Sequence, residues 1–142
     1  MEPIRVNPGR IRERMEAISA FGRSEGGGWS RFAFTQADVE AREYCVGLMK
    51  GAGLEVRVDA AGNISGRLGG HLPGPAVGVG SHLDTVKNGG MFDGVAGVVC
   101  GIEAIEAIRE AGVPVRRPLE VLVFANEEGA RFGEALFGSR VL

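Results

Sequence analysis

Five acidic and imidazole side chains that could bind a metal ion fall in three short clusters in the second half of the chain. His82 and Asp84 form the first cluster, Asp93 belongs to the second, and the adjacent Glu127 and Glu128 form the third. Four carboxylates and one imidazole brought together without a cation would repel one another, and the carboxylates would raise one another's pKa. A bound divalent metal ion would relieve that repulsion. The clusters therefore predict a metal centre, provided that the fold brings them together.

Each candidate also has a simpler interpretation. A single histidine after a strand is usually a loop or core residue, but Asp84 two positions later favours a ligand, because metal-binding histidines commonly donate their second ring N–H to a carboxylate. Asp93 could instead cap a following helix, and Glu127 with Glu128 could be a solvated pair. Neighbouring side chains on extended backbone point in different directions. One glutamate could then bind metal while the other acts as general base toward water whose pKa the metal lowers.

Hydrophobic patterns predict the elements that would position these clusters. An apolar run at residues 76–80 is typical of a strand buried on both faces, and residues 119–125 are a stronger example. Between them, residues 95–111 have apolar side chains at helical spacing. A right-handed crossover of this length makes the two strands parallel, and ligands of open α/β sheets bind beyond the carboxyl ends of such strands. All three clusters are therefore predicted at one edge of a sheet.

Further elements precede this unit. Helical spacing predicts helices at residues 9–20 and 35–51. Alternating apolar and polar residues around a glycine-containing turn predict a hairpin of strands at residues 54–59 and 63–68. The chain is therefore predicted to be an α/β protein with flanking helices.

The composition bounds the class of partner. With 142 residues, of which 44% are hydrophobic and 24% charged, the chain is the size of one domain with its own core. The formal net charge of -2 and the lack of a basic run give no reason to expect nucleic acid or a membrane surface, so a small-molecule partner is expected. Without a secretory h-region or an apolar stretch of about 20 residues, the predicted location is cytoplasmic. Cys45 and Cys100 fall within predicted helices and are expected to be reduced and buried.

At these clusters the sequence resembles the metal motifs of the aminoacylase and carboxypeptidase superfamily of dinuclear hydrolases. The similar segments are GSHLDTV at residues 80–86, GGMFDG at 89–94 and NEEGARF at 126–132. Together with GRS at residues 22–24 and RxAFT at 31–35, they are similar to the hydantoinase/carbamoylase amidases. That branch includes N-carbamoyl-L-amino acid hydrolases, allantoate amidohydrolases and β-ureidopropionases.

The resemblance implies a role for each candidate residue. His82 would bind one metal ion, Asp93 would bridge two ions, and Glu128 would bind the second. Glu127 would be the general base, and Asp84 would orient His82. The implied cofactors are two divalent metal ions, zinc or manganese. The implied activity is hydrolysis of non-peptide C–N bonds in linear amides, N-carbamoyl amino acids or ureido acids.

The resemblance also implies that the chain is part of a larger enzyme. Residues 1–142 would form the N-terminal part of a catalytic domain with a mixed, mostly parallel sheet. Two further histidine ligands, substrate-carboxylate-binding residues and a lid or dimerisation domain would follow, and full-length relatives are expected to be homodimers. With two protein ligands per ion, where a catalytic zinc normally has about three plus water, the isolated chain is expected to be inactive.

Two alternatives stay open at this point. The chain could be a non-catalytic truncated remnant that associates through uncovered apolar sheet surface. It could also come from an aminoacylase or peptidase of the same superfamily, which would share the metal site and differ in the substrate pocket. The sequence does not distinguish a fragment, a truncated gene product and a split enzyme, and it leaves the metal, the substrate and its stereochemistry open.

Overall fold

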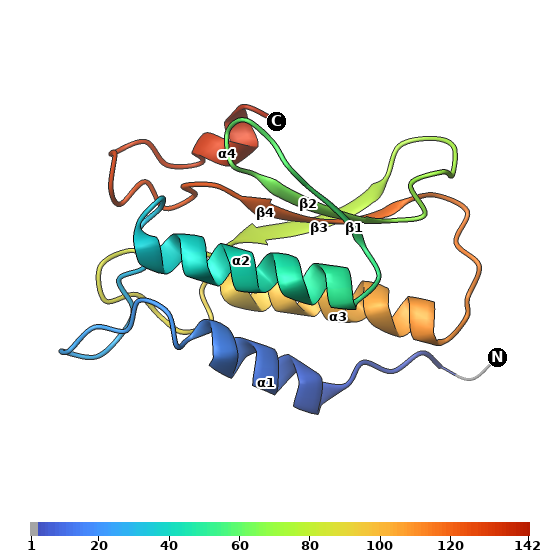
Figure 1. The fold of residues 1–142 in the computed structure, drawn as a ribbon, viewed down its shortest axis with the longest axis horizontal. Coiled ribbons are helices and arrows are strands. Elements are labelled where there is room, and N and C mark those ends of the chain that lie inside the picture. The colour runs from blue at the N-terminus through green and yellow to red at the C-terminus, as the bar shows by residue number, and fades with distance from the viewer. Residues whose placement is uncertain (1–2) are drawn as a thin grey trace.

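A four-stranded mixed sheet with helices packed against it forms the framework of the computed structural model, which describes residues 3–142 (Figure 1). The elements in chain order are α1 (Pro8–Ile18), α2 (Gln36–Gly51), β1 (Glu55–Val58), β2 (Ile64–Leu68), β3 (Val77–His82), α3 (Val95–Glu110), β4 (Leu119–Phe124) and α4 (Phe137–Arg140). Every helix and strand predicted from the sequence is present within a few residues of its expected bounds. The short helix α4 was not predicted.

The strand order is β1-β2-β4-β3, and the expected mixed sheet is confirmed. The hairpin strands β1 and β2 pair antiparallel, and β2 pairs antiparallel with β4. Only β3 and β4 pair in parallel. The expected majority of parallel pairings is therefore not found among these strands, because the hairpin joins β4 in the antiparallel sense and only the β3–α3–β4 crossover produces a parallel pair.

The predicted βαβ unit is confirmed, and its register places the two strands side by side with their starts and their ends level. Val77 lies opposite Leu119 at the start of the ladder, and His82 lies opposite Phe124 at its end. The segments that follow β3 and β4 consequently leave the sheet side by side. This alignment places the first and third clusters of polar residues at the same edge.

Strand β3 is exposed rather than buried on both faces as predicted. Val77 and Val79 are 53% and 42% exposed, whereas Val121 and Val123 on β4 are fully buried. The difference arises because β4 has a strand on each side, while β3 lies at the edge of the described sheet and has β4 as its only neighbour. A short apolar run does not reveal whether its strand is central or at an edge.

Helices α2 and α3 pack against one face of the sheet, and α1 packs outside them, mainly against α3 (Figure 1). The core between these layers is aliphatic. Its largest fully buried members include Ile18, Met49, Ile64, Leu83, Ile102, Val121 and Val123. Among residues 3–142, no helix is long and apolar enough to cross a membrane.

The two cysteines differ in their surroundings. Cys45 is buried in α2, as predicted, and burial raises the pKa of its thiol to about 12. Cys100 is exposed on α3, and the prediction of a buried thiol there is wrong. The apolar stripe of α3 passes through Val98, Ile102 and Ile105, and Cys100 lies beside that stripe rather than on it.

An ionic cluster fastens α1 to α3. The fully buried carboxylate of Glu103 accepts hydrogen bonds from Arg10 Nε at 2.6 Å, Arg14 Nη1 at 3.2 Å and the Asn7 N–H at 2.7 Å. Burial by itself would raise the pKa of Glu103, but the hydrogen bonds from Arg10 and Asn7 outweigh it and hold the pKa below its ordinary value. Removing this carboxylate would leave two cations without their central partner.

Candidate metal centre

Three side chains with metal-binding atoms meet at the carboxyl edge of β3 and β4. One ligand atom from each of His82, Asp93 and Glu128 lies within 4.8 Å of the other two. His82 is buried at the end of β3, the Asp93 side chain is 61% exposed before α3, and Glu128 is partly buried after β4. The structure thus brings together the three residues that the sequence analysis assigned as ligands. Separations of this size suit side chains arranged around divalent ions after small adjustments.

The ring of His82 is held by the backbone. Its Nδ1 lies 2.9 Å from the carbonyl oxygen of Asp84 and 3.8 Å from the Asp84 carboxylate. Its Nε2 faces Asp93 at 3.8 Å and Glu127 at 3.6 Å. With Nδ1–H donating to the carbonyl, Nε2 has a free lone pair for a metal ion. The nearer partner is the Asp84 carbonyl, whereas the sequence analysis expected the carboxylate.

The carboxylate of Asp84 has a different task. It is buried, and its two oxygens accept the backbone N–H groups of Glu127 and Glu128, each at 3.1 Å. Asp84 therefore joins the segment after β3 to the segment after β4. This contact was not predicted from the sequence. Asp84 lies 43 and 44 positions before the two glutamates, and no sequence pattern links residues so far apart.

The turn after β4 directs the two glutamates. Asn126 has a left-handed backbone conformation (φ 50°), and its buried side chain donates to the carbonyl of Glu134 at 2.9 Å. Gly129 also has positive φ (65°), and a Cβ there would lie 2.5 Å from the Ala135 nitrogen. These two positions bend the chain sharply as it leaves β4. Neither was a candidate site residue, although the turn-forming residue types were visible in the sequence.

Asp93 does not cap helix α3 with its side chain. The N-cap residue of α3 is Gly94, and the cap makes no side-chain hydrogen bond. Gly94 has φ 68°, and a Cβ at this position would lie 2.5 Å from the His82 carbonyl oxygen and 2.6 Å from its ring. Glycine is therefore required for the close approach of this turn to His82. The Asp93 carboxylate is left facing the other two candidate ligands.

The electrostatics of the cluster favour a cation. Burial raises the pKa of Glu128, and the charges of Asp93, Glu127 and Asp84 raise it further, while His82 opposes them. A divalent ion among these groups would offset the mutual repulsion of the carboxylates. Imidazole nitrogen and carboxylate oxygen are donors that zinc and manganese both accept. The residues present thus fit the metal ions that the sequence analysis expected.

Known proteins include several with similar sequences. Residues 78–142 match the family described as Peptidase family M20/M25/M40. An N-carbamoyl-L-amino-acid amidohydrolase from Paenarthrobacter aurescens is 46% identical over 134 residues, which cover 94% of this chain and 32% of that protein. A ureidoglycolate hydrolase from Arabidopsis thaliana is 42% identical over 133 residues, which cover 93% of this chain and 28% of that protein.

The fold comparison gives the same result. The crystal structure of a hydantoinase/carbamoylase family amidase from Burkholderia ambifaria matches with a TM-score of 0.92 at 37% sequence identity, covering 97% of this chain and 34% of that one. The chain spans about a third of the length of the curated relatives it matches. In both sequence and fold, the chain is similar to the hydantoinase/carbamoylase-type amidases, and its residues 78–142 match the peptidase M20/M25/M40 family.

Proposed function

We propose that the chain is part of a metal-dependent amidohydrolase, which cleaves C–N bonds in N-carbamoyl amino acids, ureido acids or related linear amides. The observation that carries this proposal is the convergence of His82, Asp93 and Glu128, with Glu127 beside them, at the carboxyl edge of a parallel strand pair. The similarity to an N-carbamoyl-L-amino-acid amidohydrolase and to a ureidoglycolate hydrolase supports this substrate class.

In this proposal each residue has one task. His82, Asp93 and Glu128 would hold two divalent ions, zinc or manganese. When bound, such ions polarise a substrate carbonyl and lower the pKa of water. Glu127 accepts the proton of the attacking water and passes it to the leaving nitrogen as the C–N bond breaks. Asp84 keeps both glutamates in place through their backbone N–H groups.

The position of Glu127 suits a general base. Its carboxylate lies 3.6 Å from His82 Nε2, and its side chain is 27% exposed, so water and substrate can reach it. It is not one of the three residues whose ligand atoms gather within 4.8 Å of one another. A carboxylate next to the ligands, yet outside the ligand set, can exchange protons without losing a metal ion.

The proposal extends to the rest of the enzyme, its substrate and its assembly. Because the chain spans about a third of its relatives, we propose that turnover needs further metal ligands and substrate-binding groups from the rest of such a protein. The partner would be a small-molecule amide or ureido compound, and the assembled enzyme would be a homodimer.

Activity assays on an enzyme of the relatives' length that carries this segment test the proposal. N-carbamoyl-L-amino acids and ureidoglycolate are expected to be cleaved at least about 100-fold faster than dipeptides with the same side chains. The reason is that a site built to hydrogen-bond a polar substrate group rejects compounds that lack the group. Chelation is expected to abolish turnover, and added zinc or manganese to restore it. Preferential cleavage of dipeptides would favour the peptidase alternative, and turnover unaffected by chelation would contradict a metal-dependent reaction.

A further inference from the structure

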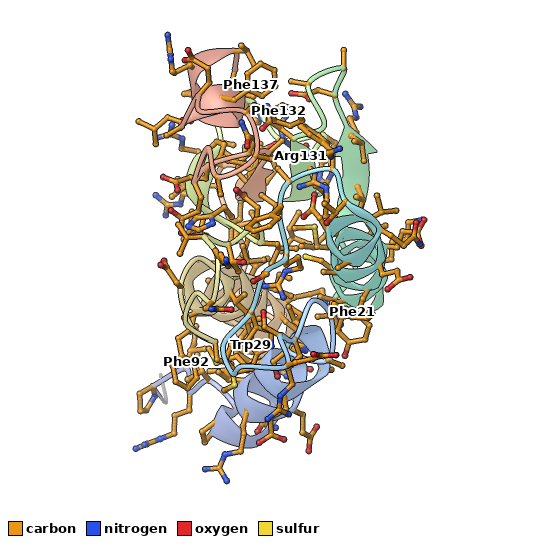
Figure 2. The ribbon with its side chains drawn as sticks, turned by 90° about the vertical axis from the view of Figure 1, so that its left-hand side faces the viewer. Phe21, Trp29, Phe92, Arg131, Phe132 and Phe137 are labelled. Atoms are coloured by element: carbon orange, nitrogen blue, oxygen red, sulfur yellow. The ribbon has the colours of Figure 1, made fainter. Side chains whose placement is uncertain are left out.

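The loop between α1 and α2 reaches the metal-binding segments without supplying a ligand. Trp29, labelled in Figure 2, lies on this loop and exchanges two backbone hydrogen bonds with Gly89, at 3.1 and 2.8 Å. The Thr85 N–H donates to the carbonyl of Arg31 at 2.9 Å, and the Thr85 hydroxyl donates to the carbonyl of Trp29 at 3.0 Å. Loop residues 29–31 therefore lie along the chain that leads from His82 toward Asp93.

Arg31 is the most deeply buried cation of this loop. Its side chain is almost fully inaccessible, and its Nε donates to the carbonyl of Leu83 at 2.7 Å while its Nη1 donates to the carbonyl of Phe21 at 2.8 Å. Its backbone N–H donates to the Thr85 hydroxyl at 2.9 Å. Leu83 stands between His82 and Asp84, so Arg31 holds the stretch of backbone that orients both of them.

Burial of the charged Arg31 side chain is energetically unfavourable at this position. Burial lowers the pKa of its guanidinium, and the carboxylates of Asp38 and Asp84 oppose that effect. An apolar side chain of similar volume could fill the space without desolvating a cation. What arginine adds is a planar set of donors that fixes several carbonyl groups at once.

The same loop also contacts the segment after β4. The carbonyl of Ala33 accepts a hydrogen bond from Arg131 Nη1 at 3.1 Å, and the Phe34 and Phe132 rings lie 6.1 Å apart. Arg131 and Phe132 lie close together in Figure 2, with the guanidinium 5.0 Å from the ring centre. The loop thus touches both segments that carry candidate ligands.

We propose that Arg31 is a positioning residue of the metal centre, which fixes the backbone from Leu83 to Thr85 and thereby sets the position of His82. The proposal rests on the proposed function, because it assigns Arg31 a role toward the same metal ions. Arg31 contacts no candidate ligand atom in the structure, so its effect is transmitted through the backbone. Groups that orient metal ligands typically contribute about 10- to 100-fold to metal affinity.

Zinc affinity tests the proposal, measured by competition with a chromophoric chelator on an enzyme of the relatives' length that carries this segment. Arg31→Met is expected to weaken zinc binding about tenfold or more. Arg31→Lys is expected to bind as weakly as Arg31→Met, because an ammonium group keeps the charge but lacks the planar donors. Unchanged affinity in Arg31→Met would overturn the proposal. Full affinity in Arg31→Lys would also overturn it, since charge alone would then suffice.

A control variant separates positioning from loss of stability. Glu103→Gln disrupts the ionic cluster between α1 and α3, away from the site, and is expected to lower Tm by about 10 °C. Its zinc affinity, measured well below Tm, is expected to equal that of the unaltered chain. If Glu103→Gln weakens zinc binding as much as Arg31→Met, the effect is one of general stability and the positioning role is wrong.

A milder variant covers the case in which Arg31→Met does not fold. Thr85→Val keeps the volume of a buried side chain but removes the hydroxyl that bonds both Arg31 and Trp29. It is expected to weaken zinc binding several-fold, and unchanged affinity would contradict the proposal. Failure of the unaltered enzyme to bind zinc would overturn the metal centre itself, whereas equal binding by every variant would overturn only the role of Arg31.

Discussion

Glu127→Gln and Glu128→Gln are expected to have different effects in an enzyme of the relatives' length that carries this segment. Glu127→Gln removes the proposed base but no ligand, so turnover is expected to fall by about 10² or more with metal content unchanged. Glu128→Gln removes an anionic ligand, so metal content is expected to fall together with turnover and to recover in part at high added metal. The two variants change neighbouring residues in the same way, and each is a matched control for the other.

Elemental analysis alongside steady-state turnover distinguishes the two glutamates. Glu128 is the one whose ligand atom lies with those of His82 and Asp93, and its pKa is raised by burial and by neighbouring carboxylates. Glu127 instead lies beside His82 with a partly exposed side chain. Loss of metal in Glu127→Gln, with metal retained in Glu128→Gln, would reverse the assigned roles.

Gly94→Ala is expected to displace His82 and weaken zinc binding by about 100-fold, a large effect for a single methyl group. The added Cβ would lie 2.5 Å from the carbonyl oxygen and 2.6 Å from the ring of His82. Alanine also resists the positive φ of 68° at this position. Either the turn before α3 or the end of β3 must then move, and both carry candidate ligands.

Gly90→Ala provides the matched control for this substitution. It adds the same methyl group to the same loop, where the new Cβ would meet no atom within 4 Å. Its zinc affinity and thermal stability are expected to match those of the unaltered chain. Zinc competition and thermal unfolding of both variants check the prediction. Unchanged zinc binding in Gly94→Ala would show that His82 is not held where the structure places it, or that it does not bind zinc.

The sequence predicted the parts of this arrangement that depend on local patterns. The apolar runs before His82 and Asn126, with the helix between them, were sufficient to predict parallel strands and a common edge for the polar clusters. This succeeded because a crossover of that length has one preferred handedness. The positions of His82 and Glu128 follow from where the two strands end, and that of Asp93 follows from where α3 begins.

Contacts between distant segments could not be predicted in the same way. The hydrogen bonds from Asp84 to the turn after β4, and those from Arg31 to Leu83, depend on how loops cross in space. Those crossings depend on positive φ angles at residues such as Asn126 and Gly94. Composition and periodicity carry no signal for such contacts. The motif that contains Arg31 was noticed only by its resemblance to a family motif. The hydrogen bonds of Arg31 that indicate its role are found only in the structure.

Crystals of an enzyme of the relatives' length that carries this segment, grown with zinc and measured at the zinc absorption edge, test whether this edge of the sheet binds metal. We predict anomalous density about 2.0–2.2 Å from His82 Nε2 and from a carboxylate oxygen of Glu128. Two peaks about 3.5–4 Å apart, with Asp93 between them, are expected at full occupancy. Zinc bound elsewhere, with His82 and Glu128 free of it, would contradict the assignment of this edge of the sheet as a metal centre.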